Sequence, residues 1–229
     1  PTLIAVGDVV ELRDKLNFFE SKPLFGKNVI VTRSRTQSSS LVSKISDLGG
    51  NPIEVPTIKI EKIENNIALE NEIKNIKDYT YLILTSKNAV DIFFDKLDEM
   101  DLDSRVLANL KVCAIGSATA KEIKNRGIKA DVVPEKFVAE YLFEELKDVL
   151  KDSDKVLIPR SKNARDFLVD KISEICEVKE VHIYETVLDD SKKDEVLDIL
   201  NSGEADYITF ASSSTVTNFV DIIGKENID

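Results

Sequence analysis

The sequence has almost none of the residues that most often build metal sites and nucleophilic catalytic sets. Its 229 residues include one histidine, His182, two cysteines, Cys113 and Cys176, and no tryptophan. A zinc site of the usual kind, or a Ser-His-Asp set, would have to use that single imidazole. Both cysteines lie in apolar stretches, where a free cysteine usually serves as a small buried hydrophobe. Catalysis must therefore rely on other side chains, and we expect no metal site.

Glycine-rich nucleotide-binding turns and long apolar runs are also missing. The sequence contains no G-x-G-x-x-G or G-x-x-x-x-G-K-[ST] pattern, and the turn TRSRTQSSS has no glycine. No run reaches the roughly 20 apolar residues of a membrane helix, and no signal-like start is present. The net charge of −11, with both signs scattered along the chain, disfavours nucleic acid and anionic membranes as partners. We therefore expect a cytoplasmic protein, and the start at Pro1 suggests a piece of a longer one.

What the sequence does contain is an internal duplication. Tyr81–Phe94, YLILTSKNAVDIFF, is echoed by Tyr207–Val220, YITFASSSTVTNFV, which begins 126 residues later. Val29–Arg35, VIVTRSR, is echoed by Val156–Lys162, VLIPRSK, which begins 127 residues later. A repeat of this length indicates a duplicated half-protein, in contrast to the short units of a solenoid. Two lobes are therefore predicted.

The apolar pattern predicts strands that alternate with helices. A short strand is expected within 1–10, and further strands at 28–31, 52–55, 81–84, 112–115, from 155 to Arg160, at 178–184 and at 207–210. A strong amphipathic helix is expected at 137–150, and another after Arg160-Ser161 to about Ile175. Such alternation is typical of parallel sheets with helices on both faces, an α/β fold. In residues 58–63 isoleucines and charged residues nearly alternate, which suits a half-exposed ribbon. Residues 185–190 occupy the equivalent place in the second copy, so the two segments could pair as a bridge between the lobes.

Hydroxyl and cationic residues gather at the predicted carboxyl ends of the strands, where ligands bind in parallel α/β sheets. A single Ser or Thr at such a place is more often a helix N-cap than a ligand contact. Five such ends together predict a cleft for a large, polyanionic, hydrogen-bonding ligand. They read Thr32-Arg33-Ser34, Thr85-Ser86-Lys87-Asn88, Gly116-Ser117-Ala118-Thr119, Pro159-Arg160-Ser161-Lys162 and Ala211-Ser212-Ser213-Ser214.

Tyr184 is the acid/base candidate of interest. With so little histidine, such a role falls to Tyr, Lys, Asp or Glu, and Tyr184 lies where the predicted strand meets the ribbon. A tyrosine at a strand end is more often a packed ring with a solvated hydroxyl. The residues alone leave both interpretations open.

Five segments, taken in order and spacing, resemble the uroporphyrinogen-III synthase family: ILTSKNAV, VCAIGSATA, VLIPRS, VHIYET and ITFASSS. The resemblance runs from Gly26 to the end. It implies two flavodoxin-like, doubly wound parallel-sheet lobes joined by a two-stranded ribbon. One lobe would comprise 26–57 and 189–229, the ribbon 58–63 and 184–188, and the other lobe 64–183. Residues 1–25 resemble the carboxyl end of uroporphyrinogen-III C-methyltransferase, which implies a remnant of a natural fusion.

The family resemblance implies cyclisation of the linear tetrapyrrole hydroxymethylbilane to uroporphyrinogen III, with inversion of ring D and loss of water. This step belongs to porphyrin, sirohaem and cobalamin biosynthesis, and no cofactor is implied. Tyr184 would assist departure of the hydroxyl as a proton donor. Ser86, Thr119, Ser212 and Ser213 would bind substrate side chains. The strand-end pattern adds Arg33, Thr85, Lys87, Ser117, Arg160 and Ser161 as substrate-binding candidates.

One departure from the family pattern concerns the carboxyl end of the chain. A second IG-x-x-T segment, the counterpart of Ile115–Thr119, is absent. The discontinuous lobe is therefore expected to lack a strand, a turn and a helix, to expose a sheet edge, and to leave the chain with weak or no activity. The alternative function is a noncatalytic two-lobed binder of a small polyanionic ligand that closes about its ribbon. A sugar or nucleotide transferase would want a glycine-rich turn.

Overall fold

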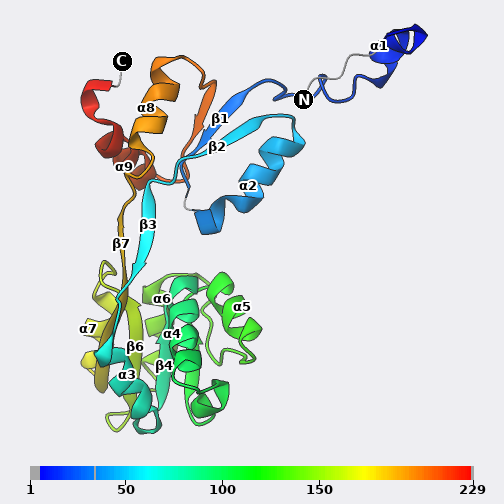
Figure 1. Cartoon of the computed structure of the whole chain (residues 1–229). Coiled ribbons are helices and arrows are strands. Elements are labelled where there is room, and N and C mark those ends of the chain that lie inside the picture. Colours follow the sequence, from blue (N-terminus) through cyan, green and yellow to red (C-terminus); the bar gives the residue numbers. More distant parts are fainter. Residues whose placement is uncertain (1–5, 34, 228–229) are drawn as a thin grey trace. The chain divides into compact units, whose positions relative to one another are not determined.

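The computed structural model describes residues 6–33 and 35–227 (Figure 1). Its contacts divide the chain into two compact units. Lobe 1 comprises Pro1–Lys59 and Val187–Asp229, and lobe 2 comprises Ile60–Thr186. The chain passes from one lobe to the other within β3 (Ile58–Lys62) and returns within β7 (Glu177–Leu188). None of the described helices is long and apolar enough to cross a membrane.

The larger sheet has five strands in the order β3-β7-β6-β4-β5. Besides β3 and β7, they are β6 (Lys155–Ser161), β4 (Tyr81–Leu84) and β5 (Lys111–Ala114). β4 is parallel to β5 and β6, and β6 is parallel to β7. β3 runs antiparallel to β7, because the Ile63 N–H donates to the Ile183 carbonyl while the Asp189 N–H donates to the Thr57 carbonyl. The predicted α/β fold with parallel sheets and a two-stranded ribbon is confirmed.

Helices cover both faces of this sheet because the side chains of a strand alternate between the faces. Leu82 and Leu84 of β4 join a core with helices α3, α4 and α5, whereas Tyr81 and Ile83 join a second core with α6 and α7. These helices span Ile67–Lys74, Lys87–Glu99, Ser117–Asn125, Ala139–Leu146 and Phe167–Ser173. Cys113 is fully buried in the second core, and burial raises the pKa of its thiol to about 12. All four residues of β4 are thus buried, because helices cover both faces of the sheet at this strand.

Lobe 1 repeats this plan on three described strands in the order β2-β1-β8, all parallel. The strands are β1 (Asn28–Val31), β2 (Asn51–Glu54) and β8 (Tyr207–Thr209). Val29 and Val31 pack with Ile45 of α2 (Arg35–Asp47), and Ile30 packs in the core that includes α8 (Lys193–Asn201) and α9 (Ser213–Ile223). Before β1, η1 (Asp8–Leu12) and α1 (Arg13–Leu16) form short helical turns. The predicted strand at the start of the chain falls mostly outside the described residues.

Two helix predictions were wrong in extent. The helix expected at 137–150 is confined to Ala139–Leu146, and Phe137 and Val149 are 56% and 49% exposed. The helix expected after Arg160-Ser161 and to about Ile175 is confined to Phe167–Ser173. Residues 162–166 form a loop instead, and the buried Arg160 side chain binds Arg165 and Asp166 of that loop. The strands agree with the prediction to within a few residues at each end.

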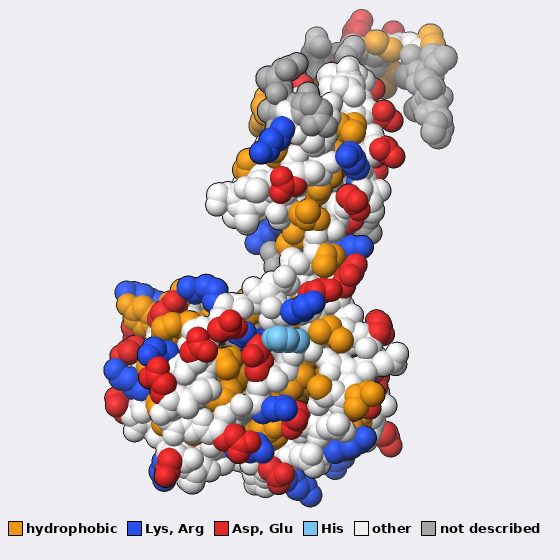
Figure 2. Space-filling model, turned by 90° about the vertical axis from the view of Figure 1, so that its left-hand side faces the viewer, with side chains coloured by type: hydrophobic (Ala, Val, Ile, Leu, Met, Phe, Trp, Pro, Cys, Tyr) orange, Lys and Arg blue, Asp and Glu red, His pale blue; other side chains and the backbone are white. Residues whose placement is uncertain are grey.

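The remaining described elements are the short 3-10 turns η2 (Ile76–Asp78), η3 (Ser104–Leu107) and η4 (Lys225–Asn227). On the face drawn in Figure 2, acidic and basic side chains are interspersed with apolar ones. This surface matches the scattered charge of the sequence.

Candidate active site

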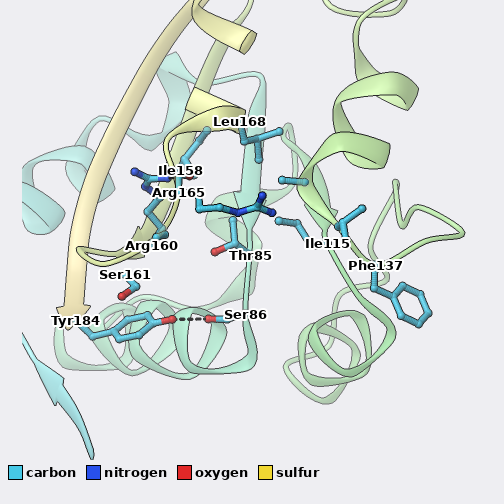
Figure 3. Close-up of a pocket in the computed structure, with 13 residues that line it drawn as sticks. Thr85, Ser86, Ile115, Phe137, Ile158, Arg160, Ser161, Arg165, Leu168 and Tyr184 are labelled. Atoms are coloured by element: carbon cyan, nitrogen blue, oxygen red, sulfur yellow. Dashed lines mark hydrogen bonds between the residues drawn. The ribbon is translucent and has the colours of Figure 1, made fainter. Parts of the chain in front are cut away.

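A cavity of about 310 Å³ lies at the carboxyl edge of the lobe 2 sheet (Figure 3). It collects residues from the ends of β4, β6 and β7 and from the segments that lead into α6 and α7. Its polar lining consists of four hydroxyls and two guanidiniums, from Thr85, Ser86, Ser161, Tyr184, Arg160 and Arg165. No Asp or Glu is among the described residues that line it. Such a lining favours an anionic, hydrogen-bonding ligand.

Tyr184 is 5% exposed, and its ring packs in the lobe 2 core. The pairing of β6 with β7 shifts by one residue, so that Arg160 lies opposite His182 but Ser161 lies opposite Tyr184. Such bulges redirect side chains beside active sites. Here the shift brings Tyr184 onto the same side as Ile183, away from the exposed His182. The tyrosine is therefore a packed ring whose hydroxyl reaches the cavity wall.

The Tyr184 hydroxyl lies 2.9 Å from the Ser86 hydroxyl oxygen, as the dashed line in Figure 3 shows. Ser86 is the N-cap of α4, and its oxygen accepts the Ala89 backbone N–H at 3.0 Å. Either hydroxyl can donate in this pair, and in one arrangement the Ser86 proton is directed to the Tyr184 oxygen. The Tyr184 proton is then available to a ligand in the cavity.

Arg160 is 3% exposed, and all three of its guanidinium nitrogens have partners within lobe 2. Nε binds Glu180, Nη2 binds Asp166, and Nη1 donates to the Arg165 carbonyl at 2.6 Å. The sequence predicts a substrate contact by Arg160, but in the structure its guanidinium holds the loop 162–166 against β7. Arg160 is thus placed to position the loop that carries Arg165.

Arg165 is the cation that the sequence prediction missed. Its side chain is largely exposed and lines the cavity, and its Nη1 lies 3.1 Å from Glu140 Oε1 on α6. The sequence predicts a helix after Arg160-Ser161, which would have carried this side chain away from the strand end. The sequence signal that could have found Arg165 is its place as a second arginine, five residues after Arg160, near the end of a predicted strand.

Three predicted residues of lobe 2 are not among those that line the cavity. Lys87 begins α4, and its ammonium lies 3.6 Å from Glu122 of α5. Ser117 is exposed at the start of α5, whereas Thr119 in the same turn is buried. Their contact with substrate stays a prediction, and the burial of Thr119 disfavours it.

The predicted residues of lobe 1 gather at the carboxyl ends of β1 and β8. Arg33 and Ser212 line a hollow of about 280 Å³ together with Thr32, Thr57, Ser214 and Thr215. Ser212 is the N-cap of α9, and its oxygen accepts the Thr215 N–H at 3.3 Å. Ser213 is exposed in the first turn of that helix and is not among the residues that line the hollow. The duplicated sequence thus produces one polar hollow at the strand ends of each lobe.

The N-caps at equivalent repeat positions permit a matched test. Ser86→Ala and Ser212→Ala should each lower the free energy of unfolding by about 1 kcal/mol, because each removes the acceptor for a helix N–H. Urea unfolding followed by circular dichroism measures the change. Replacement of the exposed Ser213 by alanine is the control, with little change expected. No loss in either cap variant would mean that these serines do not cap their helices in solution.

Comparison with known proteins adds to this geometry. The family model described as uroporphyrinogen-III synthase HemD matches residues 39–229. The chain belongs to the uroporphyrinogen-III synthase family. It is 39% identical over 221 residues to a porphyrin biosynthesis protein HemD from Ruminiclostridium josui, a match that covers 96% of this chain and 44% of that protein. The chain thus spans less than half of that relative's length.

A uroporphyrinogen-III synthase from Synechococcus elongatus is 30% identical over 206 residues, which cover 89% of this chain and 77% of that protein. Among solved structures, a mutant uroporphyrinogen III synthase from Thermus thermophilus aligns with a TM-score of 0.60. The alignment covers 86% of this chain and 77% of that one at 17% identity. At that identity the likeness supports the fold of this synthase-family chain and says nothing about individual residues.

Proposed function

We propose that this chain cyclises hydroxymethylbilane to uroporphyrinogen III, with inversion of ring D and loss of water. The observation that carries the proposal is the Tyr184–Ser86 hydroxyl pair, held 2.9 Å apart at the wall of a cavity in a chain of this family. No cofactor enters the proposed reaction, and we place the protein in the cytoplasm. Membrane and nucleic acid are not among the partners we propose.

The lining of the lobe 2 cavity suits the substrate. Hydroxymethylbilane carries eight carboxylates, which need hydroxyls, amides and cations as partners. Thr85, Ser86 and Ser161 supply hydroxyls to the cavity, and Arg165 supplies a cation. We further propose that the lobe 1 hollow, with Arg33 and Ser212, holds other carboxylates of the same substrate. Holding a flexible chain in the shape that cyclises is itself a large catalytic contribution.

The chemical step needs a proton at the departing hydroxyl. In our proposal the Tyr184 O–H protonates that oxygen as the carbon–oxygen bond breaks, so that water leaves and a stabilised cation remains on the substrate. The Ser86 hydroxyl stabilises the oxygen of Tyr184 by the hydrogen bond already present. The cation then rearranges through a spiro intermediate and closes the ring. The substrate loses one proton at ring closure, which replaces the proton that Tyr184 gave to the departing water. Lys87, Ser117, Thr119 and Ser213 remain proposed secondary contacts.

The direct test supplies hydroxymethylbilane to the natural protein in which this chain occurs and separates the products by chromatography. We expect the type III isomer in excess over the type I isomer that forms spontaneously. A product mixture identical to that of the protein-free reaction would overturn the proposal. Tight binding of hydroxymethylbilane without conversion would instead favour the noncatalytic two-lobed binder.

We also propose that residues 1–25 are the end of a uroporphyrinogen-III C-methyltransferase fused to the synthase. The Ruminiclostridium josui relative, more than twice as long as the matched stretch, supports a longer parent. Val6, Leu16 and Phe18 are exposed, as expected for side chains that pack against another domain. An immunoblot of the natural protein tests this, because a fused enzyme would be far heavier than the 25.6 kDa of this chain.

A further inference from the structure

An ion pair joins two walls of the lobe 2 cavity. Arg165 belongs to the loop between β6 and α7, and Glu140 lies in the first turn of α6. Their side chains meet at 3.1 Å, and the residue before Glu140, Ala139, lines the cavity with Arg165. Both side chains are exposed, 73% for Arg165 and 41% for Glu140. The pair is therefore formed in water at the rim of a site that lacks acidic lining among its described residues.

We propose that Glu140 is an internal competitor for the substrate carboxylate that Arg165 binds. In the empty site the Glu140 carboxylate occupies one edge of the Arg165 guanidinium, and a substrate carboxylate replaces it on binding. The proposal rests on the proposed function for the identity of the substrate. It makes Arg165 a substrate-binding residue and Glu140 a residue that sets affinity.

The exchange is feasible because exposed ion pairs are weak. Their net contribution is typically about 0.2–1 kcal/mol, so a substrate carboxylate that is also held elsewhere in the cavity can displace Glu140. Arg160 cannot serve in this way, because it is buried and bound to Glu180, Asp166 and the Arg165 carbonyl. Of the two guanidiniums that line the cavity, only that of Arg165 has an exchangeable partner of this kind.

The sign of the Glu140 effect separates this role from a structural one. Glu140→Gln should lower KM for hydroxymethylbilane about two- to fivefold, because it removes the competitor and leaves Arg165 in place. Arg165→Gln should raise KM about tenfold or more, since a charged hydrogen bond to substrate is lost, and adding Glu140→Gln to it should have no further effect. Glu144→Gln is the matched control, because Glu144 lies on the same helix and pairs with Lys147 away from Arg165.

An unchanged or raised KM in Glu140→Gln would overturn the proposal, and so would a lowered KM in Glu144→Gln of the same size. Thermal unfolding of each variant shows whether the loss of an acidic residue in the first turn of α6 merely weakens that helix. Citrate binding, measured by calorimetry on the same proteins, gives a readout that does not depend on catalysis. If Glu140→Gln binds citrate more tightly but no variant forms type III product, the proposed function is refuted. The proposal that Glu140 competes with a ligand carboxylate for Arg165 would then still stand.

Discussion

Replacing Tyr184 with phenylalanine should lower kcat about 100-fold without loss of the fold. The change removes the proposed proton donor at the cavity wall and keeps the ring that packs in the lobe 2 core. General acid catalysis typically contributes a factor of about 10² to 10⁴. We expect the lower end, because the cation left on the substrate is stabilised and positioning supplies much of the remainder. Single-turnover formation of type III product measures the change.

Tyr79 provides the matched control. It is also a buried tyrosine of lobe 2, and its hydroxyl donates to Glu72 at 2.5 Å. Burial, with the hydrogen bond to Glu72 adding to it, raises the pKa of Tyr79 far above its usual range. Tyr79→Phe therefore loses a buried hydrogen bond without touching the cavity, and its kcat should stay within about twofold of the parent. An unchanged kcat in Tyr184→Phe would remove the proton-donor role and leave the family membership intact.

The fold was predictable where a stretch of sequence decides its own structure. Residues 81–84 form a strand as predicted, because four consecutive apolar residues suit a strand buried on both faces. The start of the following helix was also predictable, since Ser86 is a preferred N-cap. The duplication then extended both predictions to Tyr207 and Ser212 in lobe 1.

The fold was not predictable where distant contacts decide. The start of α7 depends on Arg160, whose partners Glu180 and Asp166 come from β7 and from the loop itself. No local pattern in RSKNARDF indicates that Arg160 will pair with Glu180 and Asp166. Phe137 extends the apolar pattern of α6 but lies outside the helix, where its Cβ is 3.4 Å from the position that a Cβ on Gly116 would occupy. At that distance the two carbons would be in ordinary van der Waals contact, so Phe137 packs beside the turn that follows β5 instead of continuing α6.

The place of the candidate site was predictable, but the direction of its side chains was not. The sequence predicts ligand contacts at the carboxyl ends of parallel strands, and in the structure three of the predicted residues, Thr85, Ser86 and Ser161, line one cavity. It cannot tell which way a side chain turns after the strand ends. Lys87 thus turns to Glu122 on a neighbouring helix, and Arg165 enters the cavity from a loop that was predicted as helix.

Arg160→Met gives the second large effect, on stability. The free energy of unfolding should fall by about 3 kcal/mol, because the loss of one member of a buried ion pair leaves the other charge without its partner. Most of the loss comes from Glu180, which is 26% exposed, since Asp166 is 70% exposed and stays hydrated. Methionine keeps the apolar stem, so the change reports on the guanidinium alone. Urea unfolding of lobe 2 measures it.

Lys162→Met is the control for Arg160→Met, because the neighbouring Lys162 forms an exposed pair with Glu185 at 3.2 Å. Its loss should lower the free energy of unfolding by less than about 1 kcal/mol. The two roles considered for Arg160 predict different combinations of stability and binding. A direct substrate contact would raise KM and leave stability unchanged. If Arg160 instead holds the loop 162–166, its replacement lowers the free energy of unfolding, and KM rises only because Arg165 loses its position.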